Sequence, residues 1–232
     1  MRAALRLAPV ALLLLMLAAC GGGSKSAATT STRATSTQAT DTQATQTDAS
    51  GCTTVTPPAG GKRDEPKPTH ALDPSKTYDV KLQTNCGSFT IRLAVKTSPA
   101  TTASFASLVQ KHFFDGTIFH RIVPGFVVQG GDPTGTGGGG PGYQTVDKPP
   151  ASTAYTLGVV AMAKTQTEAP GTSGSQFFVV TAQDAQLPPD YAVLGHISAG
   201  SAVVSRIGEL GDQSTEQPTE TVEIEHATLT VH

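Results

Sequence analysis

Apolar and polar side chains alternate in a region of the chain that begins near Lys76. Residues 78–84 and 88–94 carry apolar side chains at about every second position, and Asn85-Cys86-Gly87 lies between them. A period of two is typical of strands with one buried face, and a short polar connection joins such strands into a hairpin. We therefore predict a hairpin at the start of a globular domain that covers residues 76–232.

The rest of this domain predicts more short strands and two helices. Ser98 and Pro99 have the form of a helix N-cap followed by proline at the first helical position, so we expect a helix from Pro99 to about Lys111. A second helix is expected at residues 200–207, and further strands at residues 118–123, 126–129, 155–163, 176–181, 192–197 and 222–231. Many short strands with glycine-rich turns indicate a mainly β fold, with an antiparallel sheet closed on itself.

Residues 1–19 have a different pattern. Arg2 and Arg6 precede an apolar block that ends at Ala19, and this block is shorter than the roughly 20 apolar residues that cross a membrane. We predict a signal peptide. The sequence Leu-Ala-Ala-Cys that ends at Cys20 resembles the cleavage box of bacterial lipoproteins, in which the cysteine carries a diacylglyceryl group. This resemblance implies lipidation of Cys20 and an extracytoplasmic chain held on the bacterial cell membrane; a secretory signal with an incidental cysteine is the alternative.

Residues 20–75 lack the side chains that build a core. Threonine, serine, alanine, glutamine and glycine dominate as far as residue 50, and four prolines follow between residues 57 and 68. Such a segment buries too little apolar surface to offset its conformational entropy. We predict a disordered tether that lets the domain range about 40 Å from the membrane.

Composition and cysteine usage narrow the function classes. The 232 residues have a formal net charge of −2 and contain no long run of lysine and arginine, which argues against a nucleic-acid partner. With Cys20 assigned to lipid, Cys52 and Cys86 form an even pair in an exported chain, and we predict a disulfide between them. Two free thiols are the alternative.

Several short patterns suggest other chemistries but fit them poorly. Residues 135–140 match the glycine spacing of a dinucleotide site, yet Pro141-Gly142 follows where a helix should begin. Residues 171–175 lack the final glycine of a nucleophile elbow. Three of the histidines, His112, His120 and His196, are scattered without the spacing of zinc ligands, so we expect no metal.

Two longer motifs carry a resemblance to a known family. Residues 119–132 read FHRIVPGFVVQGGD and resemble the central motif of the cyclophilins, the cyclosporin-binding class of peptidyl-prolyl isomerases. Residues 174–178, GSQFF, resemble their second signature, and the segment 157–163 resembles the stretch before it. The likeness covers about residues 76–232. It implies a closed eight-stranded antiparallel β-barrel capped by two α-helices, a monomer, and catalysis without metal or cofactor.

The implied chemistry is rotation about the peptide bond before proline. Amide resonance sets a barrier of roughly 18–20 kcal/mol, and in the twisted transition state the prolyl nitrogen regains a lone pair. A guanidinium that donates to this nitrogen binds the transition state more tightly than either ground state. By resemblance, Arg121 is this donor.

The resemblance also assigns the remaining site residues. It places the proline ring against Phe126, Val127, Phe178 and Leu187. It gives Gln129 the task of holding the substrate carbonyl and orienting the arginine, and His120 a place in the lining. Three further residues would contact the peptide before proline, two of them through backbone groups: Ala163, Lys164 and Gln176.

The chain departs from the family pattern at two of the binding positions. Gln186 stands where many members have tryptophan, and Tyr191 where many have histidine. Both are retained as substrate-binding candidates. Because cyclosporin binding benefits from the indole ring, we expect this chain to bind cyclosporin weakly.

Two function classes follow. The first is an isomerase that acts on proline-containing, unfolded or exported polypeptides. The second is a non-catalytic module or holdase at the cell envelope that binds proline-containing segments, because a site that binds both isomers equally does not accelerate their exchange. A structural envelope protein that keeps only the barrel is a third, weaker reading.

Overall fold

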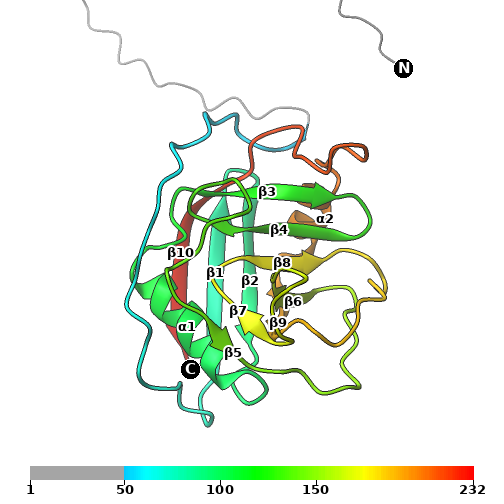
Figure 1. The fold of residues 1–232 in the computed structure, drawn as a ribbon. Helices are drawn as coiled ribbons and strands as arrows, with labels where there is room; N and C mark the ends of the chain where they lie inside the picture. Colours follow the sequence, from blue (N-terminus) through cyan, green and yellow to red (C-terminus); the bar gives the residue numbers. More distant parts are fainter. Residues whose placement is uncertain (1–49) are drawn as a thin grey trace, which may run out of the picture. The chain divides into compact units, whose positions relative to one another are not determined.

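The computed structural model describes residues 50–232, so the predicted signal peptide, Cys20 and the first part of the tether lie outside the described residues. The described chain forms a closed antiparallel barrel with the strand order β1-β10-β3-β4-β8-β6-β9-β2, together with two helices (Figure 1). The mainly β, eight-stranded barrel fold is therefore confirmed. The barrel strands are β1 (Tyr78–Thr84), β2 (Gly87–Leu93), β3 (Thr117–Val123), β4 (Val127–Asp132), β6 (Val159–Met162), β8 (Phe177–Val180), β9 (Val193–Ala199) and β10 (Glu223–Val231).

Two short strands were not predicted from the sequence. β5 (Thr145–Val146) and β7 (Thr172–Ser173) pair with each other in a separate two-stranded sheet. Each strand has two residues, which is too few for a periodic pattern to appear. Their pairing fastens two loops that follow β4 and β6.

The interior cluster combines valine, leucine and isoleucine side chains with a group of phenylalanine rings. The ring of Phe177 meets the rings of Phe105, Phe114 and Phe119 edge-on, with centroids 5.5, 6.0 and 5.9 Å away. Edge-to-face contacts of this kind add to the stabilisation that comes from burying the rings. Both helices, α1 (Pro99–Gln110) and α2 (Ser201–Gly208), contribute buried residues to this interior cluster.

A second apolar cluster covers the outer face of β4, β8 and β6. In β8, Phe177 and Val179 join the barrel interior, whereas Phe178 and Val180 point the other way into the outer cluster. A strand buried on both faces has no polar alternation, which explains the continuous apolar run in this part of the sequence. The outer cluster lies beneath the chain that follows β8.

Helix α1 begins where the sequence predicted, but its N-terminus is satisfied differently. Ser98 is the N-cap residue and Pro99 the first helical residue, yet the Ser98 side chain makes no capping hydrogen bond. The backbone N–H of Thr101 instead donates to the Asp147 carboxylate at 2.6 Å. An acidic group at this position also interacts favourably with the helix dipole.

Residues 50–75, which we call the strap, correct the prediction of a tether that is disordered up to residue 75. The strap is extended along the outside of the barrel (Figure 1). Gly61 N donates to Pro133 O and Glu65 N to Pro141 O, both at 2.9 Å, and Arg63 donates to the carbonyls of Phe113 and Asp115. The strap is therefore held by hydrogen bonds to backbone carbonyls of the barrel domain, although it has few apolar side chains to bury.

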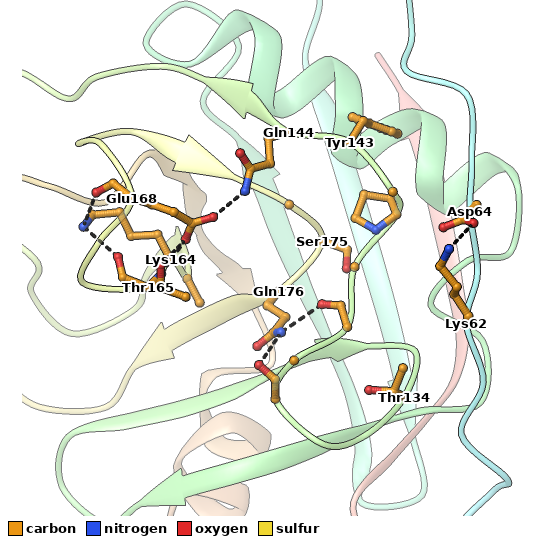
Figure 2. A pocket seen from close by; sticks show the side chains of 18 of the residues that line it. Lys62, Asp64, Thr134, Tyr143, Gln144, Lys164, Thr165, Glu168, Ser175 and Gln176 are labelled. Carbon is orange, nitrogen blue, oxygen red and sulfur yellow. Dashed lines mark hydrogen bonds and ion pairs between the residues drawn. The ribbon is translucent and has the colours of Figure 1, made fainter.

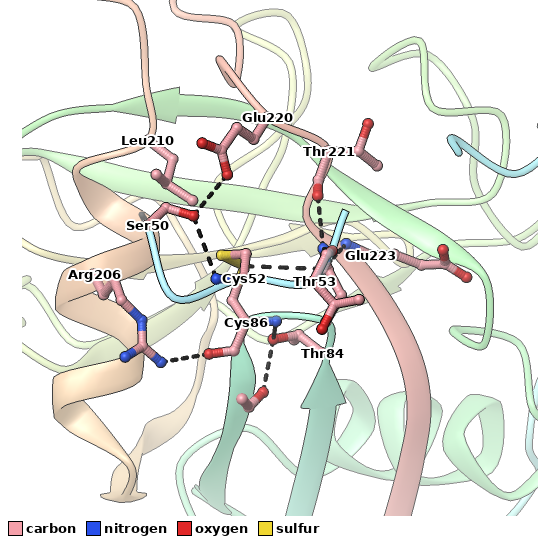
Figure 3. Close-up of a disulfide and its surroundings, with 12 residues drawn as sticks. Ser50, Cys52, Thr53, Thr84, Cys86, Arg206, Leu210, Glu220, Thr221 and Glu223 are labelled. Atoms are coloured by element: carbon pink, nitrogen blue, oxygen red, sulfur yellow. Dashed lines mark hydrogen bonds between the residues drawn. A yellow bond between two sulfur atoms is a disulfide. The ribbon is translucent and has the colours of Figure 1, made fainter. Parts of the chain in front are cut away.

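The start of the strap is joined covalently to the β1–β2 turn. Cys52 and Cys86 form a disulfide (Figure 3). Beside it, the Asn85 side chain donates to Thr53 O at 2.7 Å and to Thr221 O at 3.0 Å, and accepts from Glu223 N at 2.9 Å. Asn85 therefore ties the strap to the segment that leads into β10.

Within residues 50–232, every helix is too short or too polar to span a bilayer.

Candidate active site

A bulge in β3 turns Arg121 to the outside of the barrel. Phe119 pairs with Gly130 and Arg121 with Gln129 on β4, so His120 is an extra residue in the ladder. In a regular strand, residues 119 and 121 would point to the same face. The bulge breaks this alternation, and therefore Phe119 is fully buried in the interior while Arg121 stays partly exposed outside.

The strand register aligns Arg121 with three other side chains. Arg121 lies opposite Gln129, Gln129 opposite Phe178 on β8, and Phe178 opposite Ala161 on β6. Directly opposed residues of antiparallel strands project to the same side of the sheet. We call this series the cross-strand row, and it places a guanidinium, an amide and an aromatic ring next to one another on the outer face.

Two side chains hold the guanidinium. Arg121 Nε donates to Glu216 Oε2 at 2.7 Å, and its Nη1 donates to Gln129 Oε1 at 3.4 Å. Glu216 lies in the loop between α2 and β10, in the left-handed conformation with φ of 59°. This conformation is costly for a residue other than glycine, and here backbone hydrogen bonds from Ile122 N to Glu216 O and from Glu216 N to Asp212 O maintain it.

A chain of amide hydrogen bonds continues from the arginine. Gln129 Nε2 donates to Gln176 Oε1 at 3.2 Å, and Gln176 Nε2 donates to the carbonyls of Gly137 and Gly139 at 2.9 and 3.0 Å. These glycines belong to residues 133–142, which we call the glycine loop. The orientation of Arg121 is therefore coupled to the position of the glycine loop.

Asp132 holds the glycine loop from the inside. Its carboxylate accepts from the backbone N–H groups of Thr134, Gly137 and Gly139 at 2.7, 2.6 and 3.1 Å. Burial acts to raise the pKa of Asp132, but these hydrogen bonds outweigh it and lower the pKa below its usual value. The backbone N–H groups of the glycine loop therefore bind a carboxylate of the protein's own chain, that of Asp132.

His120 lines the same region. Its ring lies 3.7 Å from the position that a Cβ on Gly137 would occupy. Burial lowers the pKa of His120 below its usual 6.5, and the Arg121 charge acts in the same direction, whereas Asp132 opposes both. The imidazole is therefore neutral at pH 7.

The side chains predicted to hold the proline ring gather in the outer cluster, which the cross-strand row enters at Phe178. Phe178 and Val127 belong to the outer cluster, with Phe126, Leu187 and Tyr191 packed against it. The rings of Phe178 and Tyr191 meet edge-on, 5.4 Å apart at 87°. These aromatic and aliphatic side chains therefore form an apolar cluster on the same face of the sheet as Arg121.

A buried tyrosine fixes the orientation of Tyr191. The Tyr155 hydroxyl donates to Tyr191 O at 2.6 Å and accepts from Tyr191 N at 2.9 Å. Burial raises the pKa of Tyr155 to about 12, so it remains a donor across the physiological range. The Lys164 ammonium lies over the ring of Tyr191, 5.5 Å from its centroid.

A groove of about 1140 Å³ lies next to the cross-strand row (Figure 2). Ala163, Lys164 and Gln176 line its inner part, and Ala163 N donates to Gln176 O at 2.9 Å. Its other walls come from the glycine loop, from the strap, and from Tyr143, Gln144, Thr165, Glu168, Gly174 and Ser175. The groove shares Gln129 with the row, so it extends directly from the arginine.

Gln186, a predicted substrate-binding residue, lies apart from the outer cluster. Gln186 is exposed, has a positive φ of 51°, and its backbone N–H donates to Asp184 at 2.9 Å. It does not join the outer cluster, unlike the next residue, Leu187. Among the described residues, no group of three or more histidine, cysteine, aspartate or glutamate side chains is arranged to hold a metal ion.

The structure also brings in residues that the sequence did not suggest. Glu216 reaches Arg121 from 95 positions away, and no local pattern marks it. The strap residues Lys62, Asp64 and Glu65 line the groove although their composition resembles a linker. Glu216 and the strap residues could be assigned to the site only from contacts in the folded chain.

Comparisons with known proteins agree with this geometry. A family model described as cyclophilin-type peptidyl-prolyl cis-trans isomerase matches residues 79–229. A peptidyl-prolyl cis-trans isomerase-like 1 protein of Gibberella zeae is 38% identical over 152 residues, which cover 64% of this chain and 92% of that protein. A peptidyl-prolyl cis-trans isomerase of Arabidopsis thaliana is 37% identical over 150 residues, covering 63% and 90%.

Solved structures give the same result. The crystal structure of a cyclophilin-type peptidyl-prolyl cis-trans isomerase from Cryptosporidium parvum matches with a TM-score of 0.61 and 28% identity, covering 66% of this chain and 98% of that one. A second structure of the Cryptosporidium protein, determined in the presence of the dipeptide Ala-Pro, matches with the same TM-score and 29% identity.

Proposed function

Because this chain belongs to the cyclophilin-type peptidyl-prolyl cis-trans isomerase family, we propose that it isomerises X-Pro bonds of exported polypeptides, with Arg121 as the hydrogen-bond donor to the prolyl nitrogen. The observation that carries this proposal is the cross-strand row. It sets Arg121, Gln129 and Phe178 side by side on one face, and Phe178 belongs to the outer apolar cluster.

The outer cluster and the arginine have complementary tasks. The proline ring is apolar and packs against Phe178, Val127, Phe126 and Leu187, which leaves the prolyl nitrogen facing the row. As the amide twists, its resonance is lost and the nitrogen becomes an acceptor. Arg121 then donates to an atom that accepts only in the transition state, so the contact lowers the barrier and leaves ground-state binding unchanged.

The partners of Arg121 prepare it for this task. Glu216 and Gln129 hold the guanidinium before a substrate arrives, at 2.7 and 3.4 Å. A donor that is already oriented needs little reorganisation at the moment of reaction, which is the usual source of electrostatic catalysis in enzymes. Gln129 also places its amide where it can bind the substrate carbonyl.

Backbone groups that line the groove bind the substrate residues that precede proline. Ala163 and Lys164 follow β6 directly and line the groove, with Gln176 beside them. Their backbone groups are the expected partners of an extended chain. His120 remains neutral and lines the site, and no proton transfer is needed for rotation about a bond.

The test is catalysis itself. The exchange time between the cis and trans isomers of a short proline peptide, measured by NMR with catalytic amounts of the protein, is expected to fall well below the uncatalysed tens to hundreds of seconds. A binding module gives peptide binding without faster exchange. Binding without acceleration would therefore favour the holdase alternative.

Replacing Glu216 with glutamine is expected to lower kcat/KM about two- to fivefold. The change removes the charge that holds Arg121 Nε, but both side chains are partly exposed, at 33% and 46%, and an exposed ion pair contributes about 0–1 kcal/mol. Peptide affinity and Tm should change little. The matched control is Glu209→Gln, whose side chain is exposed at the end of α2; an equal loss of activity in both variants would contradict the positioning role.

The export part of the proposal concerns residues 1–49. We propose a signal peptide at residues 1–19, lipidation of Cys20 and attachment to the cell membrane from outside the cytoplasm. The Cys52–Cys86 disulfide supports an oxidising compartment. Cys20→Ser is expected to move the protein from the membrane fraction to the soluble fraction without affecting catalysis, and unchanged membrane attachment of this variant would overturn the lipid anchor.

A further inference from the structure

We propose that the strap is part of the substrate site. Residues 60–65, together with the glycine loop, form the wall of the groove that receives the residues preceding proline, and the charges of Lys62 and Asp64 act on the side chains bound there. This inference rests on the proposed isomerase function and adds to it a segment from outside the barrel.

The strap lies directly on the glycine loop, and backbone hydrogen bonds join the two segments near both ends of the loop. Gly61 N donates to Pro133 O and Glu65 N donates to Pro141 O, each at 2.9 Å. Next to the first of these bonds the two segments are too close for an ordinary side chain, because a Cβ on Gly60 would lie 2.3 Å from Thr134 O. This close fit requires glycine at position 60.

The strap side chains reach the groove at its outer end. Asp64 packs on the glycine loop so closely that a Cβ on Gly142 would meet its Oδ1 at 2.8 Å. Asp64 also pairs with Lys62 at 2.7 Å, and Figure 2 shows this pair on the strap beside the loop. Both side chains are mainly exposed, at 79% for Lys62 and 56% for Asp64. Because the pair is exposed, a charged ligand can interact with either side chain.

The opposite wall also carries charged side chains, which are hydrogen-bonded to backbone groups. Lys164 donates to the carbonyls of Thr165 and Glu168, both at 3.2 Å, and Glu168 accepts from Thr165 N at 2.6 Å. Glu65, on the strap side, pairs with Lys111 at 2.9 Å. The groove therefore has polar walls in which positive and negative groups nearly balance.

These features point to an extended, polar peptide as the occupant. The glycine loop has little side-chain bulk, and a Cβ on Gly140 would meet no atom within 4 Å. A peptide backbone can therefore approach the loop closely. Because the wall charges are balanced, we expect the unchanged protein to isomerise peptides with lysine or glutamate two residues before proline at rates within about threefold of each other.

Charge reversal on the strap tests this inference. Asp64→Lys and Lys62→Glu are compared with the unchanged full chain, using two peptides that differ only by lysine or glutamate two residues before proline. Asp64→Lys should shift the ratio of the two kcat/KM values toward the glutamate peptide by about fivefold at low salt, and Lys62→Glu should shift it toward the lysine peptide. The ratio is taken within one variant, so a general loss of active protein cancels.

The matched control is Glu209→Lys, which makes the same net charge change on an exposed residue outside the groove. Its ratio should equal that of the unchanged protein. Equal shifts in Glu209→Lys and Asp64→Lys, or no shift in either strap variant, would overturn the inference. If the unchanged protein catalyses exchange in these same assays, the proposed function stands even when the strap inference fails.

Discussion

Replacing Arg121 with alanine is expected to lower kcat/KM for X-Pro isomerisation about 10- to 150-fold while proline peptides still bind. A charge-assisted hydrogen bond contributes about 1.5–3 kcal/mol, and each 1.4 kcal/mol of lost transition-state stabilisation costs about tenfold in rate. The effect should fall on kcat, because the prolyl nitrogen accepts only when the amide is twisted. Exchange NMR gives the rate, and peptide titration of the same sample gives the affinity.

Two further variants sharpen this prediction. Arg121→Lys keeps the charge but cannot reproduce the planar fork that binds Glu216 and Gln129 together, so its activity should lie between that of the unchanged protein and Arg121→Ala. Arg92→Ala is the control. Arg92 on β2 forms an ion pair with Asp79 on β1, and neither strand is a neighbour of β3 in the barrel. Full catalysis by Arg121→Ala would exclude the proposed mechanism.

Removing the disulfide with Cys52→Ser and Cys86→Ser together is expected to lower the free energy of unfolding by about 3–4 kcal/mol. The two cysteines are 34 positions apart, and cross-linking them restricts the unfolded chain. Loss of the bond also frees the start of the strap, although Asn85 still donates to Thr53. Urea denaturation followed by circular dichroism measures the change.

Reduction of the unchanged protein provides the matching measurement. Its denaturation midpoint in the presence of a reductant should approach that of the double serine variant, while the variant itself should not respond to reductant. Identical midpoints for the variant and the oxidised protein would show that the disulfide contributes no stability. This comparison separates the covalent link from any packing effect of the serine substitutions.

The fold was accessible from local patterns because each barrel strand carries its own signal. The alternation at residues 78–84 and 88–94 corresponds to β1 and β2, and Pro99 begins α1 as the N-terminal pattern predicts. The apolar run at residues 176–181 corresponds to β8, although only the structure shows why both of its faces are buried. Tertiary contacts outside these patterns, such as the Asp147 bond at the start of α1, were missed.

The candidate site was accessible only in part. The motif at residues 119–132 marked Arg121 and Gln129, and the second motif marked Phe178. The strap was misread as a linker from its proline-rich, polar composition, because composition reports how much apolar surface a segment can bury and is silent about backbone hydrogen bonds to another part of the chain. Gly61 and Glu65 find such bonds on the glycine loop.

By itself, the sequence determined the eight barrel strands and the two helices, since these follow from the spacing of neighbours along the chain. Its resemblance to the cyclophilin motifs, and not spacing, marked Arg121, Gln129 and Phe178. The tertiary structure decided how those residues are used. The bulge at His120 turns Arg121 away from the interior that holds Phe119, and Glu216 binds it from a distant loop. Strand register and contacts between distant residues depend on the closed barrel as a whole, and a local pattern cannot encode them.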